Sequence, residues 1–356
     1  MTTGKICIYL PVDESGESHR RLESAGCTVL LGDARWRTGV DRDSVLRLAR
    51  GAHVLMGSTI RGAPVDASFL DELPELRIIS KYTIGVEDID LDAATERGVL
   101  VTHCPTEANW GGVAEGTLAF MLTLLKRVRE RDRHVKQGGW RDSSLVGRYI
   151  GSRQDGFPGL TIGIVGLGRI GARVADLLAP WRVRVLAVDP YVELAKFVHH
   201  DVERVDLEML LRTADVVSLH CDLTSETRGL IGSVELGYMK QDAVLLNTAR
   251  GALVDSDALA DALDSGALAG AALDVLDEEP PPTDSRLKRM DERVLLSPHM
   301  IAANDRGTLH AAIPWATDAA LAALAGRVPE HVANVAAIPR WRERFEGRSL
   351  IEREAD

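Results

Sequence analysis

Short apolar runs alternate with helical patterns along almost the whole chain, and this alternation restricts the possible folds more than any other feature. In the first hundred residues we expect helices at residues 41–50 and 90–97 and strands at residues 6–10, 54–56, 76–79 and 99–102. Strands that alternate with helices form βαβ units, whose parallel sheet is covered on both faces. The first part of the chain therefore predicts an α/β domain.

A second array of strands and helices begins at Leu160, after a connector that contains glycine and serine. Six parallel strands are the number expected of a double mononucleotide-binding unit, and this array predicts six. They lie at residues 161–165, 183–188, 216–219, 243–247, 270–275 and 294–296. A helical pattern at residues 306–325 follows the array, and we expect the charged tail behind it to be partly mobile.

Between the two arrays, residues 112–135 carry apolar side chains at three- and four-residue steps, which predicts one long helix. Gly138 and Gly139 end this pattern. The apolar stripe has two interpretations that the residues leave open. It packs in the core of one subunit, or it forms a surface that contacts a second subunit.

The composition excludes several classes of protein. The chain of 356 residues has 42 Lys and Arg against 53 Asp and Glu, so its formal net charge is −11. This excess of negative charge argues against a nucleic acid or an anionic membrane surface as the main partner. With 45% hydrophobic residues and a mean hydropathy of −0.04, the chain is typical of globular proteins. We see no signal-peptide pattern or membrane span and expect a cytoplasmic location.

The four cysteines are far apart in the sequence and form no C-x-x-C pair. This spacing argues against a structural zinc site and fits a reducing compartment. We therefore expect no bound metal and mostly inert core thiols at Cys7, Cys27, Cys104 and Cys221.

The second array opens on a glycine-rich turn, Gly166-Leu167-Gly168-Arg169-Ile170-Gly171, between an apolar strand and a helical pattern that runs to Leu178. In a turn of this kind the first glycine allows a tight bend. The second lets the backbone approach a pyrophosphate, and the third lets the helix pack closely on the strand. The free N–H groups at the helix start would then hold the pyrophosphate.

The next predicted strand ends in Asp189, which lies 18 residues beyond Gly171. This is close to the spacing of roughly 20 residues expected for the acidic residue of a dinucleotide site. A carboxylate there accepts hydrogen bonds from the ribose hydroxyls and repels a 2′-phosphate. The turn and the carboxylate together predict NAD as the cofactor, in preference to NADP.

Several chemically able side chains follow strands of the second array, at the sheet edge where α/β proteins bind ligands. Arg250 can hold a carboxylate in a bidentate fork. His299 is of the residue type best suited to exchange a hydroxyl proton during hydride transfer. Glu279 could orient that imidazole and favour its protonated form, and Asp274 also ends a strand. We expect these four side chains to converge on one cleft.

The sequence resembles the NAD-dependent D-isomer-specific 2-hydroxyacid dehydrogenases over about residues 76–304. The resemblance rests on several blocks together: the glycine-rich turn, Ile84-Gly85-Val86-Glu87-Asp88-Ile89-Asp90, Val113-Ala114-Glu115, Leu219-His220-Cys221-Asp222-Leu223-Thr224, residues 247–255 and Ser297-Pro298-His299. It implies reversible, NAD-linked reduction of a 2-keto acid to a D-2-hydroxy acid.

The resemblance also implies roles for individual side chains. Arg250 would bind the substrate carboxylate and polarise the keto oxygen, His299 would be the acid and base, and Glu279 would pair with His299. Glu279 lies 29 positions after Arg250, which matches the family spacing. Asp274 would hold the nicotinamide carboxamide. We expect further cofactor contacts from Arg169, Ile170, Thr224, Thr248 and Ala249.

The substrate side of the site is implied by the same resemblance. Backbone amides near Ile84 and Gly85 would bind the carboxylate of a small 2-keto or 2-hydroxy acid. We expect the side chains of Thr83 and Asn109 to line this pocket.

The family architecture implies two Rossmann-like parallel-sheet domains, with the cofactor domain inserted into a discontinuous, flavodoxin-like substrate domain. Residues 1–107 and 302–356 would form the substrate domain. Residues 108–301 would form the NAD-binding Rossmann domain, and the long helix would make a homodimer.

Several positions depart from the family pattern. Thr83 stands where glycine is usual, and Gly116 stands where histidine is common. Asp222 stands where proline normally follows the pair that His220 and Cys221 form here. Residues 300–303 replace a run that usually contains glycine near the nicotinamide. None of these departures removes a catalytic group, but Thr83 and Ile301 would reshape the pocket and leave the substrate open.

Two other functions are alternatives. A formate-specific or phosphite-specific relative would carry glutamine in place of Glu279 or lysine in place of Ile84, and the chain has neither. An NAD(H)-responsive scaffold, similar to the co-repressor branch of the family, would keep the same three catalytic side chains. The scaffold would show NADH-dependent partner binding without turnover of keto acids.

Overall fold

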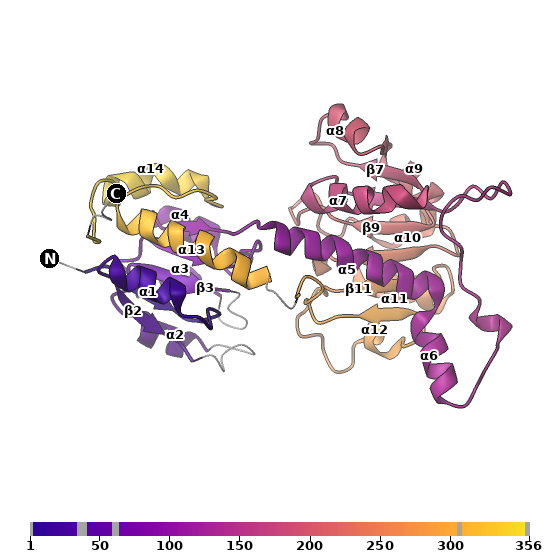
Figure 1. The fold of residues 1–356 in the computed structure, drawn as a ribbon, viewed down its shortest axis with the longest axis horizontal. Helices are drawn as coiled ribbons and strands as arrows, with labels where there is room; N and C mark the ends of the chain where they lie inside the picture. Colours follow the sequence, from indigo (N-terminus) through magenta and orange to yellow (C-terminus); the bar gives the residue numbers. More distant parts are fainter. Residues whose placement is uncertain (1–2, 34–40, 59–63, 305–307, 353–356) are drawn as a thin grey trace. The chain divides into compact units, whose positions relative to one another are not determined.

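The computed structural model describes residues 3–33, 41–58, 64–304 and 308–352. The chain divides into two compact units (Figure 1). Unit 1 combines Met1–Asn109 with Asn304–Asp356, and unit 2 is Trp110–Ala303. Because unit 1 consists of two separate segments, it is discontinuous, as the expected fold class requires. The domain boundaries predicted from the sequence are 107/108 and 301/302.

Unit 1 is built on a five-stranded parallel sheet in the order β2-β1-β3-β4-β5. This is the flavodoxin-like order, which confirms the expected fold class of this unit. The strands are β1 (Lys5–Ile8), β2 (Thr28–Leu31), β3 (Val54–Gly57), β4 (Ile78–Lys81) and β5 (Leu100–Thr102). The sequence prediction lacks β2, because this edge strand is partly exposed and its apolar run is short.

Helices cover both faces of this sheet, because successive side chains of a strand point to opposite faces. Ile6 and Ile8 of β1 pack with one set of helices, α1 (Glu17–Ser24), α13 (Thr308–Leu324) and α14 (Ile338–Phe345). Cys7, between them, packs with the other set, α2 (Arg42–Ala49), α3 (Ala67–Asp71) and α4 (Leu91–Glu96). Of the helix predicted at 306–325, residues 306 and 307 lie outside the described residues.

The sequence predicts a partly mobile tail after α13, and this stays a prediction, since residues 353–356 lie outside the described residues. The described part contains α14, whose Trp341 is fully buried in the core. The indole N–H of Trp341 donates to the backbone oxygen of Arg77 at 3.0 Å. Ile338 and Phe345 of the same helix pack against this core as well, and the charged residues between these apolar positions hide the signal in the sequence.

Unit 2 is built on a seven-stranded parallel sheet in the order β12-β11-β10-β9-β6-β7-β8. Its strands are β6 (Thr161–Val165), β7 (Arg184–Val188), β8 (Glu203–Arg204), β9 (Val216–Leu219), β10 (Val244–Asn247), β11 (Gly270–Leu273) and β12 (Val294–Leu296). The predicted count of six is wrong, because β8 is a two-residue polar strand with no apolar run. The order contains the doubly wound pattern, with its reversal between β6 and β9.

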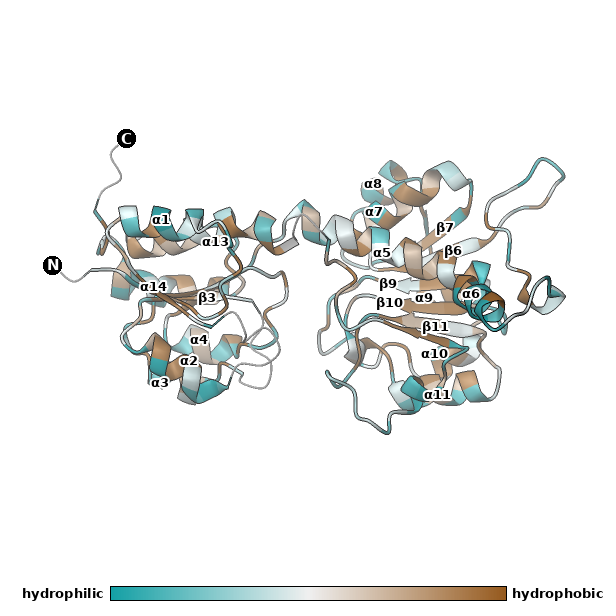
Figure 2. Ribbon diagram, turned by 60° about the horizontal axis from the view of Figure 1, so that its bottom comes forward, coloured by the Kyte–Doolittle hydropathy of each residue, from teal (hydrophilic) through white to brown (hydrophobic). Residues whose placement is uncertain are grey.

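The remaining helices of unit 2 flank this sheet (Figure 1). They are α7 (Arg169–Leu178), α8 (Leu194–His199), α9 (Leu207–Thr213), α10 (Ser233–Tyr238), α11 (Ser256–Asp264) and α12 (Arg286–Arg289). In Figure 2 the strands β9, β10 and β11 are coloured as hydrophobic, as expected of a parallel sheet that is covered on both faces.

The predicted single helix over residues 112–135 is wrong. It is two helices, α5 (Glu107–Lys126) and α6 (Val128–Lys136), separated by Arg127 in a left-handed conformation with φ of 52°. Figure 2 shows α6 as mostly hydrophilic, and it has no buried residue. The change in direction of the chain at Arg127 lets Arg133 of α6 pair with Asp291 at 2.8 Å. An ionic contact of this kind cannot be predicted from the spacing of apolar residues.

Two further properties follow from the described residues. None of their helices combines the length and the apolar character that a membrane span requires.

The four cysteines are free, and three of them are buried. Burial raises the pKa of the Cys221 thiol, which is partly exposed, to about 11. The Cys221 thiol therefore stays protonated at neutral pH and is a weak nucleophile.

Candidate active site and cofactor loop

The glycine-rich turn joins β6 to α7, and two of its glycines are required by close backbone approach. Gly166 has φ of 94°, and a β-carbon there would lie 2.6 Å from the backbone nitrogen of Cys221. A β-carbon on Gly171 would overlap the backbone oxygen of Gly166. Only glycine therefore lets α7 begin directly on the end of the strand.

Gly168 is different, because a β-carbon there would meet nothing within 4 Å. Its φ of −73° is one that any residue adopts. The fold of the protein therefore does not require glycine at position 168. Its lack of a side chain leaves open space in front of the first turn of α7, where Arg169 and Ile170 lie. Free N–H groups at a helix start bind phosphate groups, so this turn fits a dinucleotide.

The carboxylate of Asp189 is fixed by two backbone groups at the end of β7. Leu167 N donates to one of its oxygens at 2.9 Å, and Tyr191 N donates to the other at 3.0 Å. The first bond links the carboxylate directly to the glycine-rich turn. The arrangement agrees with a carboxylate that is held ready for the hydroxyl groups of a ribose.

His220 follows β9 beside this turn, and sequence reasoning gives it no role. The side chain is buried, and its Nε2 lies 2.8 Å from Ser218 Oγ. Burial lowers the pKa of His220 to about 3, so the ring is neutral at physiological pH. Its Nδ1 is buried and has no hydrogen-bond partner among the described residues. In the sequence, His220 stands out only as the end of an apolar strand and as a member of the block at residues 219–224.

His299 and Glu279 form a direct pair in unit 2. His299 Nδ1 lies 2.7 Å from Glu279 Oε2, and 42% of the histidine side chain is exposed. The other carboxylate oxygen accepts the backbone N–H of Leu276 at 3.1 Å. The carboxylate therefore fixes the ring through one nitrogen and leaves Nε2 for a substrate, which is the geometry of an acid and base with an orienting partner.

Asp274 holds the backbone that carries His299. Its backbone oxygen accepts His299 N at 2.8 Å. Its buried carboxylate accepts Met300 N at 2.9 Å and Ile301 N at 3.1 Å. Three successive N–H groups thus end on one residue. A carboxylate has about four acceptor positions, so these bonds leave room for a further donor such as the expected carboxamide.

Arg250 follows β10 in a loop that is fixed by Asn247. The side-chain nitrogen of Asn247 donates to the backbone oxygen of Arg250 at 2.8 Å, and its oxygen accepts Ala249 N at 3.1 Å. A β-carbon on Gly251 would overlap the backbone of Leu276. The glycine therefore lets the Arg250 loop lie against the loop that leads to Glu279.

The three predicted catalytic side chains follow three neighbouring strands, since Arg250, Glu279 and His299 come after β10, β11 and β12. The carboxyl ends of parallel strands share one edge of the sheet, which is the ligand-binding edge in such folds. Thr248, in the Arg250 loop, is linked to α5 by a contact of 3.0 Å between its hydroxyl oxygen and that of Thr117. Thr224 lies beyond β9 on the same edge, in a turn closed by Thr227.

The expected carboxylate-binding segment lies in unit 1, after β4. Thr83 Oγ1 donates to the backbone oxygen of Gly85 at 2.8 Å. His103 Nδ1 lies 3.3 Å from the backbone oxygen of Ile84. Asn109 lies in the first turn of α5 and donates its backbone N–H to Thr106. The Thr83 hydroxyl is therefore used to close the turn.

The same segment is anchored by a buried ion pair that sequence reasoning missed. Lys81 Nζ lies 2.6 Å from Asp88 Oδ2, and the lysine side chain is completely buried. The ammonium also donates to the backbone oxygen of Ser58 at 2.7 Å. Burial lowers the pKa of Lys81, and the nearby Asp88 opposes this effect. Both ends of the loop that contains residues 83–85 are thereby fixed.

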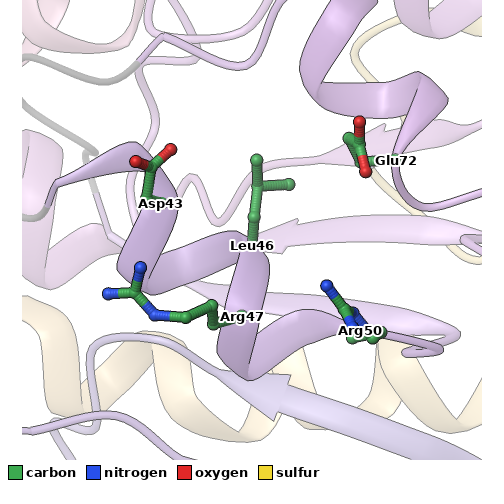
Figure 3. A pocket seen from close by; sticks show the side chains of 5 residues that line it. All are labelled: Asp43, Leu46, Arg47, Arg50 and Glu72. Atoms are coloured by element: carbon green, nitrogen blue, oxygen red, sulfur yellow. The ribbon is translucent and has the colours of Figure 1, made fainter.

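Two surface hollows lie elsewhere. The hollow in unit 1 is lined by two basic side chains, two acidic ones and a leucine (Figure 3): Asp43, Leu46, Arg47, Arg50 and Glu72. The hollow in unit 2 is lined by Arg228, Gly229, Ala252, Val254, Asp255, Ser256, Asp257 and Asp277. Charges of both signs line each hollow, and neither lining includes a predicted site residue.

Comparison with known families gives a match that agrees with this geometry. Residues 118–301 match the family described as D-isomer specific 2-hydroxyacid dehydrogenase, NAD binding domain. The chain is 38% identical over 306 residues to the D-3-phosphoglycerate dehydrogenase of Mycobacterium tuberculosis, with 85% of this chain and 56% of that protein covered. It thus spans about half the length of the relatives of this kind that it matches.

Other relatives have a length closer to that of this chain. The glyoxylate reductase of Thermofilum pendens is 38% identical over 318 residues, which cover 86% of this chain and 88% of that protein. A solved structure from Thermus thermophilus superposes with a TM-score of 0.80 at 34% identity, covering 92% of this chain and 99% of that one. A D-lactate dehydrogenase from Aquifex aeolicus, solved with NAD and lactic acid, gives 0.75 at 27% identity over 90% and 95%.

Proposed function

This chain belongs to the family of D-isomer specific 2-hydroxyacid dehydrogenases, and we propose that it interconverts a small 2-keto acid and the D-2-hydroxy acid with NAD(H). The observation that carries the proposal is the contact of 2.7 Å between His299 Nδ1 and Glu279 Oε2. A partly exposed histidine held by a carboxylate, beside an arginine loop on the ligand-binding edge, is suited to proton exchange with a 2-keto acid.

Each catalytic side chain has one task in this proposal. NAD(H), when bound, supplies or accepts the hydride. His299 donates a proton from Nε2 to the carbonyl oxygen during reduction, and takes it back from the hydroxyl group during oxidation. Glu279 stabilises the positive charge on the ring. Arg250 binds the substrate carboxylate in a bidentate fork and polarises the keto oxygen.

The cofactor contacts are part of the same proposal. Gly166, Gly168 and Gly171 shape the turn, and the first residues of α7, Arg169 and Ile170, place free N–H groups at the diphosphate. Asp189 accepts the ribose hydroxyls and disfavours a 2′-phosphate. Asp274 accepts the carboxamide N–H. Further contacts come from Thr224, Thr248 and Ala249.

The substrate class is a small 2-keto acid, with the backbone amides of Ile84 and Gly85 as further ligands of its carboxylate. Thr83 and Asn109 line the pocket. Relatives named glyoxylate reductase, D-3-phosphoglycerate dehydrogenase and D-lactate dehydrogenase support a small acid of this kind. Glyoxylate and pyruvate are therefore the first compounds to assay.

We place this activity in a homodimer in the cytoplasm. Three large side chains of the connector after α6 are strongly exposed, Trp140 by 74%, Val146 by 70% and Tyr149 by 51%. Aromatic side chains are enriched at protein interfaces, so the exposed Trp140 and Tyr149 support pairing with a second copy of the chain.

A kinetic panel tests the function. Purified protein is mixed with NADH or NADPH and a series of 2-keto acids, and absorbance of the reduced cofactor is followed. We expect turnover of at least one small 2-keto acid with NADH. The variant His299→Ala should lose at least 100-fold in kcat, since general acid–base catalysis contributes about 10² to 10⁴, and should still bind NADH. Full turnover by this variant would refute the assignment, and NADH-dependent self-association without turnover would favour a scaffold.

A further inference from the structure

One turn of α5 lies against the segment that follows His299. A β-carbon on Gly116 would overlap Cγ1 of Ile301, and would lie 2.9 Å from the backbone oxygen and 3.0 Å from Cδ1 of the same residue. The absent side chain of Gly116 thus leaves a notch in the helix, and Ile301 fills it. Because the backbone oxygen of Ile301 also lies close, a larger residue at 116 would displace the chain and not only a side chain.

Glycine is among the least favourable residues in helices, and the close approach of Ile301 gives a physical reason for glycine at position 116. Ile301 packs against the hydrophobic cluster beneath α5, which includes Ala114 and Phe120. Its backbone N–H is held by the Asp274 carboxylate at 3.1 Å. The residue is therefore fixed at both ends, by its side chain in the notch and by its N–H at the strand edge.

Two residues before Ile301, His299 has a backbone conformation that needs support. Its φ of 55° lies in the left-handed region, which non-glycine residues adopt only when the surroundings impose it. The segment is supported by the bonds from residues 299–301 to Asp274, by the Glu279 contact and by the Ile301 side chain. Of these three supports, the Ile301 side chain is the one that ties the segment to α5.

The same turn of α5 also contacts the other catalytic loop. Thr117, the next residue, places its hydroxyl oxygen 3.0 Å from that of Thr248, two residues before Arg250. Neighbouring residues of one helix therefore contact the Arg250 loop and the His299 segment. The helix acts as a common support for both.

We propose that Gly116 and Ile301 are positioning residues for catalysis, because the packing of Ile301 into the Gly116 notch sets the place of the His299 imidazole. This inference rests on the proposed function of His299. Neither residue needs to contact the reacting atoms. Their effect passes through the backbone of residues 299–301 to the contact between His299 and Glu279.

The test is a set of variants of the full chain. Gly116→Ala should lower kcat for 2-keto acid reduction at least tenfold, displace the alkaline limb of the kcat profile against pH, and change the NADH dissociation constant less than threefold. Ile301→Ala should cause a smaller loss of the same kind. Ile301→Val, which keeps the branch at Cβ, should behave as the unmodified protein.

The double variant Gly116→Ala with Ile301→Ala tests whether the overlap with the Ile301 side chain causes the loss in kcat. It removes the overlap with Cγ1 but keeps the approach of 2.9 Å to the backbone oxygen of Ile301, so its kcat and pH profile should lie closer to those of Ile301→Ala than those of Gly116→Ala do. Gly237→Ala in α10 is the matched control, because a β-carbon at that helical glycine would meet nothing within 4 Å. This control should leave kcat and the pH profile unchanged and should not lower the melting temperature, because alanine is the better helix former.

A second readout separates this inference from the proposed function. The protein is labelled with [13C]histidine, and the ring signal of His299 is assigned by its loss in His299→Gln. Gly116→Ala should move this signal, and Gly237→Ala should not, whether or not any keto acid is turned over. An unchanged signal and pH profile in a folded Gly116→Ala protein would overturn the inference, while absence of turnover in the unmodified protein would overturn only the proposed function.

Discussion

His299 Nδ1 lies 2.7 Å from Glu279 Oε2, and the second oxygen of that carboxylate is held by the backbone N–H of Leu276. The backbone N–H of Leu276 fixes the Glu279 carboxylate, and the carboxylate in turn fixes the His299 imidazole. A ring held in this way presents Nε2 in one orientation, so that its proton exchange does not require a search among rotamers.

This pair gives the first prediction, on Glu279→Gln. The neutral amide keeps the shape of the side chain but no longer favours a protonated imidazole. Reduction needs a proton on Nε2 of a ring that is held in one orientation, so kcat for reduction should fall on the order of tenfold. Steady-state rates at neutral pH measure this. NADH affinity serves as the control and should stay the same, and an unchanged kcat would contradict the role of Glu279.

Asp189 gives a prediction on cofactor choice. Its carboxylate disfavours a 2′-phosphate by charge, so Asp189→Ala should reduce the preference for NADH over NADPH by at least tenfold in kcat/KM, which is about 1.4 kcal/mol. The same change removes the acceptor of Leu167 N, so NADH binding should also weaken. Asp189→Asn keeps one acceptor oxygen and is the matched comparison. If the ratio of the two kcat/KM values stayed constant, the carboxylate would not select the cofactor.

Much of this site could be predicted from the sequence, because the signals are local. The turn from Gly166 to Gly171 needs glycine for reasons of close approach, and the structure shows the overlaps that enforce it at both ends. Arg250, Glu279 and His299 each follow an apolar strand, so that strand order alone brings them to one edge. Apolar runs and glycine positions carry this information directly.

The rest could not be predicted, because it depends on partners far away in the chain. Lys81 reads as a charged residue at a strand end, and only the fold shows that Asp88 and Ser58 bury it. Gly116 and Ile301 read as two separate departures from a family pattern, and the structure places them in one contact. The break at Arg127 likewise follows from contacts outside the helix.

The glycines of the cofactor turn give a prediction with two opposite outcomes. Gly168→Ala adds a methyl group in open space, so the melting temperature should stay within about 1 °C while the NADH dissociation constant rises at least tenfold. Gly171→Ala forces a methyl group onto the Gly166 backbone, so it should lower stability by about 2 kcal/mol or more. Thermal melting and NADH fluorescence titration distinguish them. Equal effects of both changes on stability would contradict this geometry.

The buried ion pair gives a prediction about unit 1. Asp88→Asn leaves Lys81 buried without a counter-charge, and breaking such pairs costs about 3 to 5 kcal/mol. We expect this loss in urea unfolding, together with a higher KM for the keto acid. Lys81→Met combined with Asp88→Leu should recover most of the stability, since neither charge remains. Asp155→Asn breaks the exposed pair with Arg153 and should leave the midpoint of urea unfolding close to that of the unmodified protein, because exposed ion pairs contribute little.

His220 gives a prediction about acid stability. Burial lowers the pKa of His220 from 6.5 to about 3, so between these values the unfolded chain binds a proton that the folded chain does not. Its contribution is therefore fully present above pH 6.5 and is lost as pH falls toward 3, at about 1.4 kcal/mol per pH unit. Urea unfolding at pH 7.5, 5.5 and 4.5 should show a flatter dependence for His220→Gln, whereas the exposed His310→Gln should keep the original slope. Equal slopes for all three proteins would mean that the buried ring is protonated in the folded state.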